Sequence, residues 1–391
     1  MNVPKIRFSE FTSEYKKYKF KDVATLYRGS SPRPIINFIT KSDDGVNWIK
    51  IGDVNENDTY INKTSEKITV EGSKKSRKVY KNDIILSNSM SFGRPYILNI
   101  DGCIHDGWFV VRDYNEKLVQ KYLYHFMSSP VIQKQYKKLS AGGVVSNISS
   151  DLVYSVDINI PSKEEQIKVS SFLSLIDKKI ELQSKKIEDL KLFKLSQINQ
   201  IKNDDSYKKI PLKDILMECN EKTTVNNQYE ILSSTAKGIF LQSEYFNKQA
   251  ASENNIGYKI LKRNQLVLSP QNLWMGNINI NNKYEIGIVS PSYKIFDIKT
   301  DIVNIDYFKN WIKSPRALYE YMISSEQGAS IVRRNLNMDL FGEITISVPN
   351  MNEQNKIGRI LSLIDSKISL EESKYSKLSE LKKGLMQDMF V

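Results

Sequence analysis

A duplicated segment is the feature that most constrains the fold of this chain. Residues 160–182 align with residues 348–370 at a shift of 188 positions, which places Pro161 opposite Pro349. This period is far longer than the roughly 20 to 50 residues of solenoid repeats. We therefore predict two similar, domain-sized halves. The identical pairs in the window are Glu165/Glu353, Gln166/Gln354, Lys168/Lys356, Leu173/Leu361, Ser174/Ser362, Leu175/Leu363, Ile176/Ile364, Asp177/Asp365, Lys179/Lys367, Ile180/Ile368 and Leu182/Leu370.

The length and composition favour a protein with sizeable hydrophobic cores and no membrane span. The 391 residues are 40% hydrophobic, and domains commonly contain about 100 to 200 residues. We find no run of about 18 uncharged apolar residues and no apolar signal-peptide segment near the N-terminus, so we expect a cytoplasmic protein without a membrane partner. Cys103 and Cys219 are the two cysteines, which argues against a disulfide framework and a thiolate metal cluster.

The charge of the chain favours a polyanionic partner. Lys and Arg number 57 against 45 Asp and Glu, which gives a formal net charge of +12 at pH 7. Such an excess commonly marks binding to nucleic acid. A basic protein without a polyanionic partner is the alternative that composition leaves open.

Two long amphipathic helices are predicted, over residues 161–203 and 349–391. Apolar side chains recur at helical spacing between residues 163 and 202, a stretch without Gly or Pro. Ser162 and Asn350 take the N-cap positions, and Glu165 and Glu353 stand three residues later, at capping-box spacing. A helix of 35 to 40 residues spans on the order of 55 Å at about 1.5 Å per residue, so it needs a partner along its length.

Each long helix has an obvious partner in the other copy. Apolar spacings of three, four and seven residues in both helices suggest a coiled coil. We expect an antiparallel pair that carries the two halves with pseudo-twofold symmetry. The alternative is that each helix packs only on its own domain.

The remaining segments, residues 1–160 and 204–348, are predicted to form two similar mixed α/β domains. Short apolar runs such as residues 83–86 and 265–268 are broken by turn residues and indicate strands. Short helices are expected before Ser129 and before Ser314, each of which precedes a proline. The predicted fold class is therefore α+β, with each mixed α/β domain followed by one long helix.

The sequence lacks the signatures of several catalytic sites. We find no Gly-x4-Gly-Lys-Ser/Thr loop and no Asn/Asp-Pro-Pro-aromatic tetrapeptide of an amino-methyltransferase. His105 and His125 have no partners at metal-ligand spacing, and we favour a structural role for His105 over that of a base assisted by Asp106. Asp177 and Asp365 lie on the predicted helices, where a solvated helix face is the favoured interpretation. We therefore predict a binding protein with no catalytic residue and no metal site.

Several motifs resemble the specificity (S) subunit of type I restriction-modification enzymes, and the resemblance covers the whole chain. They are the N-terminal stretch 3–8, residues 28–32 (RGSSP), residues 48–53 (WIKIGD), the repeated Pro-x3-Glu-Gln helix starts and residues 378–387. The second half departs from the first because it has no clear WIKIGD equivalent.

The resemblance implies a separate function for each part of the chain and for its partners. Residues 1–160 and 204–348 would be target-recognition domains that each read one half of a split double-stranded DNA sequence, with the two helices as spacer. The chain would dock two modification (methyltransferase) subunits and the restriction (translocase and nuclease) subunits. S-adenosylmethionine, ATP and Mg²⁺ are expected on those partners, and no cofactor is expected in this chain.

Candidate DNA contacts follow from side-chain chemistry. Arg pairs bidentately with guanine, and Asn and Gln pair with adenine, each good pair giving about 1 to 3 kcal/mol of discrimination. For each candidate, a surface loop residue without DNA contact is an equally open interpretation. The basic run of residues 74–78 is expected to face phosphates or solvent. The candidates are Arg28, Ser31, Arg33, Ser87, Asn88, Arg94, Ser146 and Asn147 in the first domain, and Lys237, Gln271, Asn272, Trp274, Arg333, Arg334 and Asn335 in the second.

Two other functions stay open at this point. One is a single-chain restriction enzyme or methyltransferase with unrecognised motifs, which would act on DNA without partners. The other is a coiled-coil scaffold that binds proteins and not DNA.

Overall fold

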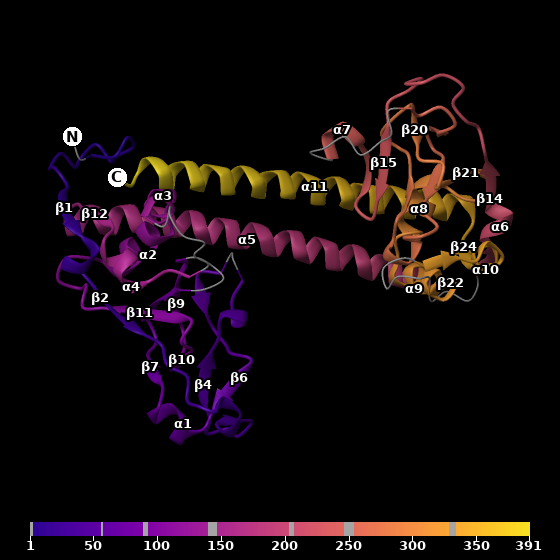
Figure 1. The fold of residues 1–391 in the computed structure, drawn as a ribbon. Helices are drawn as coiled ribbons and strands as arrows, with labels where there is room; N and C mark the ends of the chain where they lie inside the picture. Colours follow the sequence, from indigo (N-terminus) through magenta and orange to yellow (C-terminus); the bar gives the residue numbers. More distant parts are fainter. Residues whose placement is uncertain are drawn as a thin grey trace. The chain divides into compact units, whose positions relative to one another are not determined.

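The chain forms two compact units. The structure, a computed structural model, describes residues 3–55, 58–88, 93–139, 147–202, 207–245, 254–327 and 334–391. Unit 1 consists of Met1–Ser184 with Ser373–Val391, and unit 2 of Lys185–Glu372 (Figure 1). Each unit contains a mixed α/β globule and parts of both long helices, which confirms the predicted fold class. The predicted domain boundaries near residues 160, 203 and 348 stay predictions, because the division into units runs through both helices.

Unit 1 is built on two five-stranded sheets, with strand orders β2-β11-β8-β9-β5 and β3-β6-β4-β10-β7. All residues of the neighbouring strands β8 and β9 are buried, which explains why their sequences are continuously apolar rather than alternating. The strands are β2 (Thr25–Arg28), β11 (Trp108–Arg112), β8 (Ile84–Ser87), β9 (Pro95–Leu98), β5 (Tyr60–Ile61), β3 (Ile39–Thr40), β6 (Glu66–Ile68), β4 (Val46–Ile49), β10 (Gly102–Ile104) and β7 (Arg77–Val79).

A two-stranded ladder and short helices complete unit 1. Strand β1 (Lys16–Lys19) pairs antiparallel with β12 (Asp157–Ile160), so the start and the end of the globule lie together. Among the helices, α4 has Ser149 as its N-cap, whose side chain accepts a hydrogen bond from the Leu152 amide. The helices are η1 (Phe20–Asp22), η2 (Ile35–Asn37), η3 (Ile51–Asp53), α1 (Val70–Lys74), α2 (Gln120–Ser128), α3 (Pro130–Leu139) and α4 (Ser150–Tyr154).

Unit 2 contains a four-stranded sheet, β14-β21-β18-β19, and four two-stranded ladders, β13-β24, β15-β16, β17-β20 and β22-β23. Its strands are β13 (Lys208–Pro211), β14 (Leu216–Cys219), β15 (Leu232–Thr235), β16 (Gly238–Leu241), β17 (Lys259–Lys262), β18 (Leu266–Leu268), β19 (Ile278–Ile280), β20 (Ile286–Val289), β21 (Lys294–Ile298), β22 (Ser325–Gln327), β23 (Arg334–Leu336) and β24 (Thr345–Val348). Its short helices are α6 (Leu212–Ile215), α7 (Gln242–Tyr245), η4 (Leu273–Met275), α8 (Ile305–Trp311), α9 (Pro315–Ile323) and α10 (Met338–Glu343).

The two units repeat one plan. The order β2-β11-β8-β9 in unit 1 corresponds to β14-β21-β18-β19 in unit 2, and the ladder β1-β12 corresponds to β13-β24. The predicted short helices are present as α2 and α8, each followed by a second helix that begins at the predicted proline. The units differ at the WIKIGD motif, which forms β4 and η3 in the second sheet of unit 1. Unit 2 has short separate ladders in place of this second sheet.

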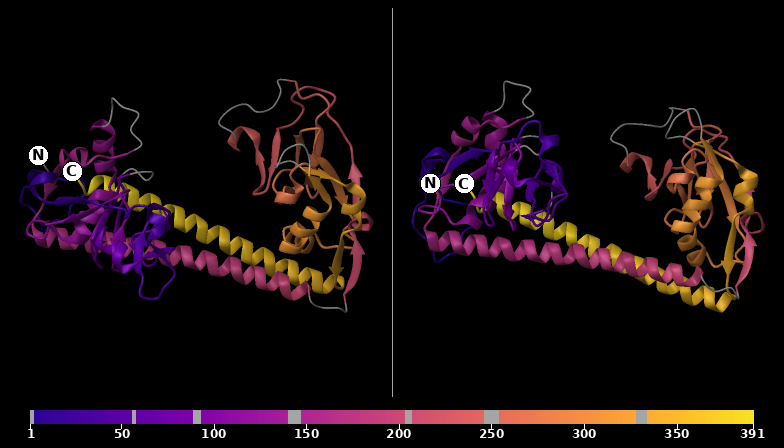
Figure 2. Two further views of the ribbon diagram at one scale, coloured as in Figure 1. Left: turned by 60° about the horizontal axis from the view of Figure 1, so that its bottom comes forward. Right: turned by 90° about the horizontal axis from the view of Figure 1, so that it is seen from below.

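The long helices α5 (Lys163–Lys202) and α11 (Met351–Asp388) pair in antiparallel fashion, side by side in every view (Figure 1; Figure 2). In unit 1 the first part of α5 packs with the last part of α11, and the cluster includes Leu173 and Met386. In unit 2 the last part of α5 packs with the first part of α11, where Leu190 and Ile198 contact Leu361 and its neighbours. The predicted antiparallel pair is confirmed, and packing of each helix only on its own domain is wrong.

Equivalent ion pairs join the two helices. Asp177 binds Lys382 in unit 1, and Asp365 binds Lys194 at 2.6 Å in unit 2. Both residues of one pair are related to those of the other by the repeat shift of 188. The sequence predicted a solvated helix face here, and this interpretation is corrected, because each aspartate faces a lysine of the other helix.

The repeated Glu-Gln dipeptide anchors each long helix to its globule. The Gln166 side chain accepts a hydrogen bond from the Val119 amide at 2.8 Å and donates to the carbonyls of Lys117 and Pro161. Gln354 makes the same set of bonds in unit 2, accepting from the Asn304 amide. Because the buried side-chain amide of each glutamine is hydrogen-bonded to backbone groups of the globule, it fixes the direction of the long helix relative to that globule.

Glu165 departs from the predicted capping box. Ser162 caps the helix as expected, since its hydroxyl accepts from the Glu165 amide at 3.3 Å. The Glu165 carboxylate instead accepts two hydrogen bonds from the Arg7 guanidinium and one from the Tyr15 hydroxyl, each at 2.8 Å. A buried carboxylate needs charged partners, and the segment near the N-terminus supplies them.

Candidate nucleic-acid interface

Most candidates of unit 1 meet at one end of the β2-β11-β8-β9 sheet. Arg28 is the last residue of β2, Ser87 is the last of β8, and Arg94 directly precedes β9. The antiparallel register places these ends together, because Phe109 pairs with Arg28 and Trp108 pairs with Ser87. The candidate residues that the sequence predicted at these strand ends therefore lie close together in the structure.

Asp106 contacts several of the candidates in the loops at this end of the sheet. Its carboxylate accepts a hydrogen bond from the Ser31 hydroxyl at 2.5 Å and lies 3.7 Å from the Arg33 guanidinium. Its backbone carbonyl accepts from the Asn88 side chain at 2.9 Å. Burial acts to raise the pKa of Asp106, but the Ser31 hydroxyl, a backbone hydrogen bond and the nearby cations hold this pKa below its ordinary value. The carboxylate is therefore ionised, and Asp106 joins three candidates in one network, two through its carboxylate and one through its backbone carbonyl.

Two hydrogen bonds orient the His105 ring, and its structural role stays a prediction. Its Nδ1 accepts a hydrogen bond from the Gly107 amide at 2.9 Å, and its Nε2 lies 2.9 Å from the Asp106 carboxylate. A ring whose Nδ1 accepts carries its proton on Nε2, so His105 donates to Asp106. Sequence reasoning treated Asp106 only as a neighbour of His105 and missed its contacts with residues far away in the chain.

Gly29 permits the close approach of the β2 loop to the residues before β11. A Cβ atom at this position would lie 2.0 Å from the His105 carbonyl oxygen, so a side chain does not fit. The basic run lies against the same loop, because Ser76 donates to the Ser30 carbonyl at 2.6 Å and Arg77 to the Arg28 carbonyl at 3.2 Å.

Two further candidates of unit 1 lie beside this loop end. The Arg94 amide donates to the Ser87 hydroxyl at 3.0 Å. Asn147 is exposed and precedes Ile148, whose amide donates to the Asn88 carbonyl at 2.7 Å. Ser146 lies outside the described residues.

The candidates of unit 2 gather at the corresponding end of its sheet. Gln271, Asn272 and Trp274 lie between β18 and β19, and Asn88 and Arg94 lie between the corresponding strands β8 and β9. The Arg334 guanidinium lies 5.0 Å from the centre of the Trp274 ring, and the Arg334 amide donates to the Gln271 carbonyl at 3.2 Å. Asn335 is exposed on β23 beside Arg334. Arg333 lies outside the described residues.

Lys237 lies on the β15–β16 turn, which other residues hold against the Trp274 loop. Lys313 donates to the Ala236 carbonyl at 3.2 Å and to the Gly276 carbonyl at 2.8 Å. Asn279 of β19 donates to the Ser234 hydroxyl at 2.7 Å and to the Thr235 carbonyl at 2.9 Å. Sequence reasoning missed Lys313 and Asn279, because neither stands near Lys237 along the chain.

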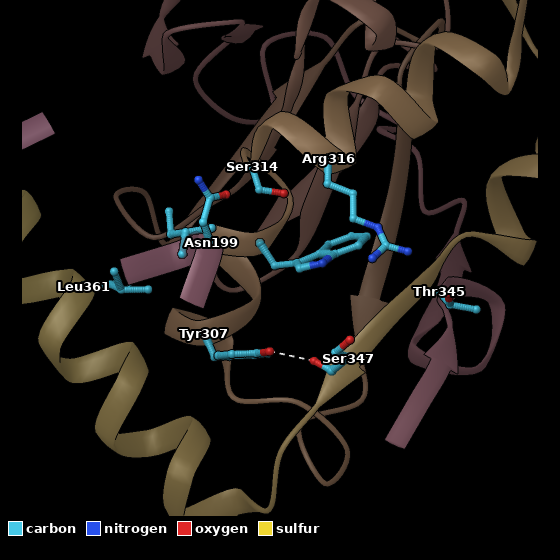
Figure 3. A pocket seen from close by; sticks show the side chains of 9 residues that line it. Asn199, Tyr307, Ser314, Arg316, Thr345, Ser347 and Leu361 are labelled. Atoms are coloured by element: carbon cyan, nitrogen blue, oxygen red, sulfur yellow. Dashed lines mark hydrogen bonds between the residues drawn. The ribbon is translucent and has the colours of Figure 1, made fainter. Parts of the chain in front are cut away.

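A small cavity at the base of unit 2 does not enlarge this interface. It has a volume of about 30 Å³ and is lined by residues of α5, α8, β24 and α11, including Tyr307 and Leu361 (Figure 3). The Tyr307 hydroxyl donates to the Ser347 carbonyl at 2.6 Å across one side of it (Figure 3). This volume has room for about one water molecule, so we assign it no ligand.

The described residues contain no cluster of three or more His, Cys, Asp or Glu side chains arranged for a metal ion. Within the same ranges, none of the helices has a stretch long and apolar enough to cross a membrane.

Part of the chain is similar to known proteins. Residues 12–192 match the family model of the type I restriction modification DNA specificity domain. The type I restriction enzyme MjaIX specificity subunit of Methanocaldococcus jannaschii is 25% identical over 260 residues. The first half of the chain thus matches the type I specificity domain, and part of it is similar to a curated specificity subunit. The aligned part is 61% of this chain and 59% of its relative, so the chain spans about three fifths of the curated relative it matches.

Solved structures show the same fold. The S subunit of a type I restriction-modification system from M. genitalium has a TM-score of 0.59 at 15% identity, covering 100% of this chain and 99% of that chain. A chain from a structure that describes complex assembly and conformational transition of the type I restriction-modification system has a TM-score of 0.59 at 13% identity, covering 96% and 97%. The predicted architecture of two mixed α/β domains with a pair of long helices is thereby confirmed.

Proposed function

We propose that this chain is a DNA specificity subunit that reads a bipartite DNA target, with the loop end of each unit contacting the bases of one half-site. The observation that carries the proposal is the convergence of the candidate residues at corresponding ends of equivalent sheets in both units. In unit 1 this end presents arginines and amides around Asp106, and in unit 2 it presents Trp274, Arg334 and Lys237. Different side chains at the two ends would read different half-site sequences.

The partners proposed for the chain are the two modification subunits, with the restriction subunits added to that complex. Leu175 and Leu182 of α5 are exposed, and so are Leu363 and Leu370, their identical counterparts on α11. Apolar side chains exposed twice at the same repeat positions suit two copies of one partner. The chain itself would be non-catalytic and cofactor-free and would act in the cytoplasm, with S-adenosylmethionine, ATP and Mg²⁺ bound by the partners.

Methylation in living cells tests the proposal directly. The full chain is co-expressed with its modification subunit in a host lacking related enzymes, and the host DNA is sequenced with methylation detection. We expect methyladenine in both halves of one split motif. Replacing Arg33 and Arg94 by alanine should alter the half-site read by unit 1 and leave the other half unchanged. A stable complex that methylates no motif would contradict the proposal.

A further inference from the structure

Unit 2 contains a basic cavity of about 340 Å³ between its reading loops and the long helices. The cavity is lined by lysines from separate elements and by one carboxylate, that of Asp365 on α11. Convergence of this many ammonium groups on one hollow creates a local positive potential, because low-dielectric walls concentrate the field of the charges. The lysines are Lys194 on α5, Lys237 on the β15–β16 turn, Lys283 between β19 and β20, Lys309 on α8 and Lys313 after α8.

Among the residues that the structure describes, Lys237, Lys283 and Lys309 form no ion pair with a carboxylate. Some other lysines of unit 2 are paired, as Lys262 is with Glu221 and Lys294 with Glu218. Three ammonium groups of the cavity are thus not held in ion pairs.

Lys313 adds a partly buried cation to the lining of the cavity. Its ammonium group donates to two carbonyls, which leaves one of its three donors for another acceptor. Burial lowers the pKa of Lys313 to about 8, and an anion in the cavity would favour the charged form again.

Three of the amide side chains around the cavity are already engaged. Asn279, Asn281 and Asn310 each donate to protein acceptors, namely Ser234, the Tyr284 carbonyl and the Asp306 carbonyl. The ammonium groups are therefore the main donors that a ligand would meet. Lysine is a flexible point charge that suits phosphate oxygens and discriminates bases poorly.

We propose that this cavity binds phosphates of the DNA backbone next to the half-site read by unit 2, on the side of the long helices. This inference rests on the proposed function, since it extends the same interface. Lys237 lines the cavity and also lies on the β15–β16 turn, which belongs to the proposed base-reading surface. Lys194 lines the cavity from the long helix α5. The cavity therefore extends from the base-reading loops towards the long helices, and the bound phosphates lie outside these loops. The contact is independent of sequence and falls in the unread spacer.

Lys309 and Lys313 have no lysine at the equivalent positions of unit 1. The alignment of Ser129 with Ser314 places Tyr124 opposite Lys309 and Ser128 opposite Lys313. The backbone contact therefore accompanies only the half-site of unit 2. This asymmetry gives the experiment an internal control on the same DNA molecule.

The test compares salt dependences of DNA binding by the full chain in complex with its modification subunits. The variant carries Lys283→Ala and Lys309→Ala, and the control carries Lys222→Ala and Lys299→Ala, which remove equal charge outside the cavity. Losing two phosphate contacts should lower the slope of log K against log salt by about 1 to 2, because each contact contributes roughly 0.9. Affinity should fall equally for target and non-target duplexes, and the methylated motif should not change.

Neutral methylphosphonates, placed singly along the spacer, locate the contact. We expect the wild-type complex to lose affinity at spacer phosphates beside the half-site of unit 2, and the double variant to be insensitive there. A second variant with Gln at both positions excludes a folding effect, and its thermal unfolding is compared with that of the wild type. ATP titrated without DNA separates a free phosphorylated ligand from backbone phosphate.

The outcomes separate the two proposals. An unchanged salt slope in a variant that still binds its target specifically would overturn the backbone site. ATP binding that needs Lys283 and Lys309 without any effect on DNA would overturn it as well. A wild-type complex without sequence preference would instead refute the proposed function.

Discussion

Glu165 and Glu353 are the same residue in two copies of the repeat, and their surroundings differ. Glu165 is buried against Arg7 and Tyr15, whereas Glu353 is partly exposed and lies 3.5 Å from the Tyr207 hydroxyl. Glu165→Gln should lower the free energy of unfolding by about 2 kcal/mol, because it removes the charge that Arg7 binds. Glu353→Gln should change it by less than about 0.5 kcal/mol. Urea unfolding measures both, and equal losses would contradict this account.

His125 should make unit 1 sensitive to acid. Burial and the charges of Lys382 and Lys121 lower the pKa of His125 to about 3, and Asp177 and Ser174 are its other polar neighbours. In the unfolded chain this pKa is about 6.5. Between about pH 6.5 and pH 3 only the unfolded state takes up the proton, so the free energy of unfolding falls as the pH is lowered, by about 1.4 kcal/mol per pH unit.

Unit 2 supplies the matched substitution for this prediction. Asn310 occupies the position of His125 in the repeat and cannot take up a proton in this range. His125→Asn should therefore lose less stability than the wild type between pH 6 and pH 4, measured by denaturant unfolding at each pH. Parallel pH curves for the two proteins would show that His125 does not titrate as described.

At the scale of elements, neighbouring leucines of α11 have opposite surroundings. Leu361 is 1% exposed inside the helix pair, and Leu363 is 63% exposed. Leu361→Ala should cost about 2 to 4 kcal/mol of stability because it leaves a cavity. Leu363→Ala, combined with Leu175→Ala, should leave stability within about 0.5 kcal/mol and weaken binding of the proposed modification subunits by about 1 kcal/mol or more. Calorimetry of unfolding and of binding distinguishes the two effects.

At the scale of the whole molecule, the helix pair should set the length of the unread spacer. Insertion of seven residues after Lys185 and seven before Lys374 keeps the apolar stripes nearly in phase. It adds about 10 Å at about 1.5 Å per residue, close to the rise of three base pairs. We expect methylation at unchanged half-sites separated by a longer spacer. Insertion in α5 alone serves as the control and should abolish methylation. An unchanged spacer after insertion in both helices would show that the helix pair does not set the spacer length.

The amino-acid sequence by itself determined the duplicated plan, both long helices with their antiparallel pairing, and the loops that carry the candidate contacts. It could do so because apolar periodicity, capping residues and repeated motifs are local signals along the chain. Only the tertiary structure decided that Asp106 joins Ser31, Asn88 and Arg33, and that Lys313 holds the Lys237 turn. These contacts join residues far apart in sequence, since their partners are chosen by strand register and by burial of polar groups, which no local pattern encodes.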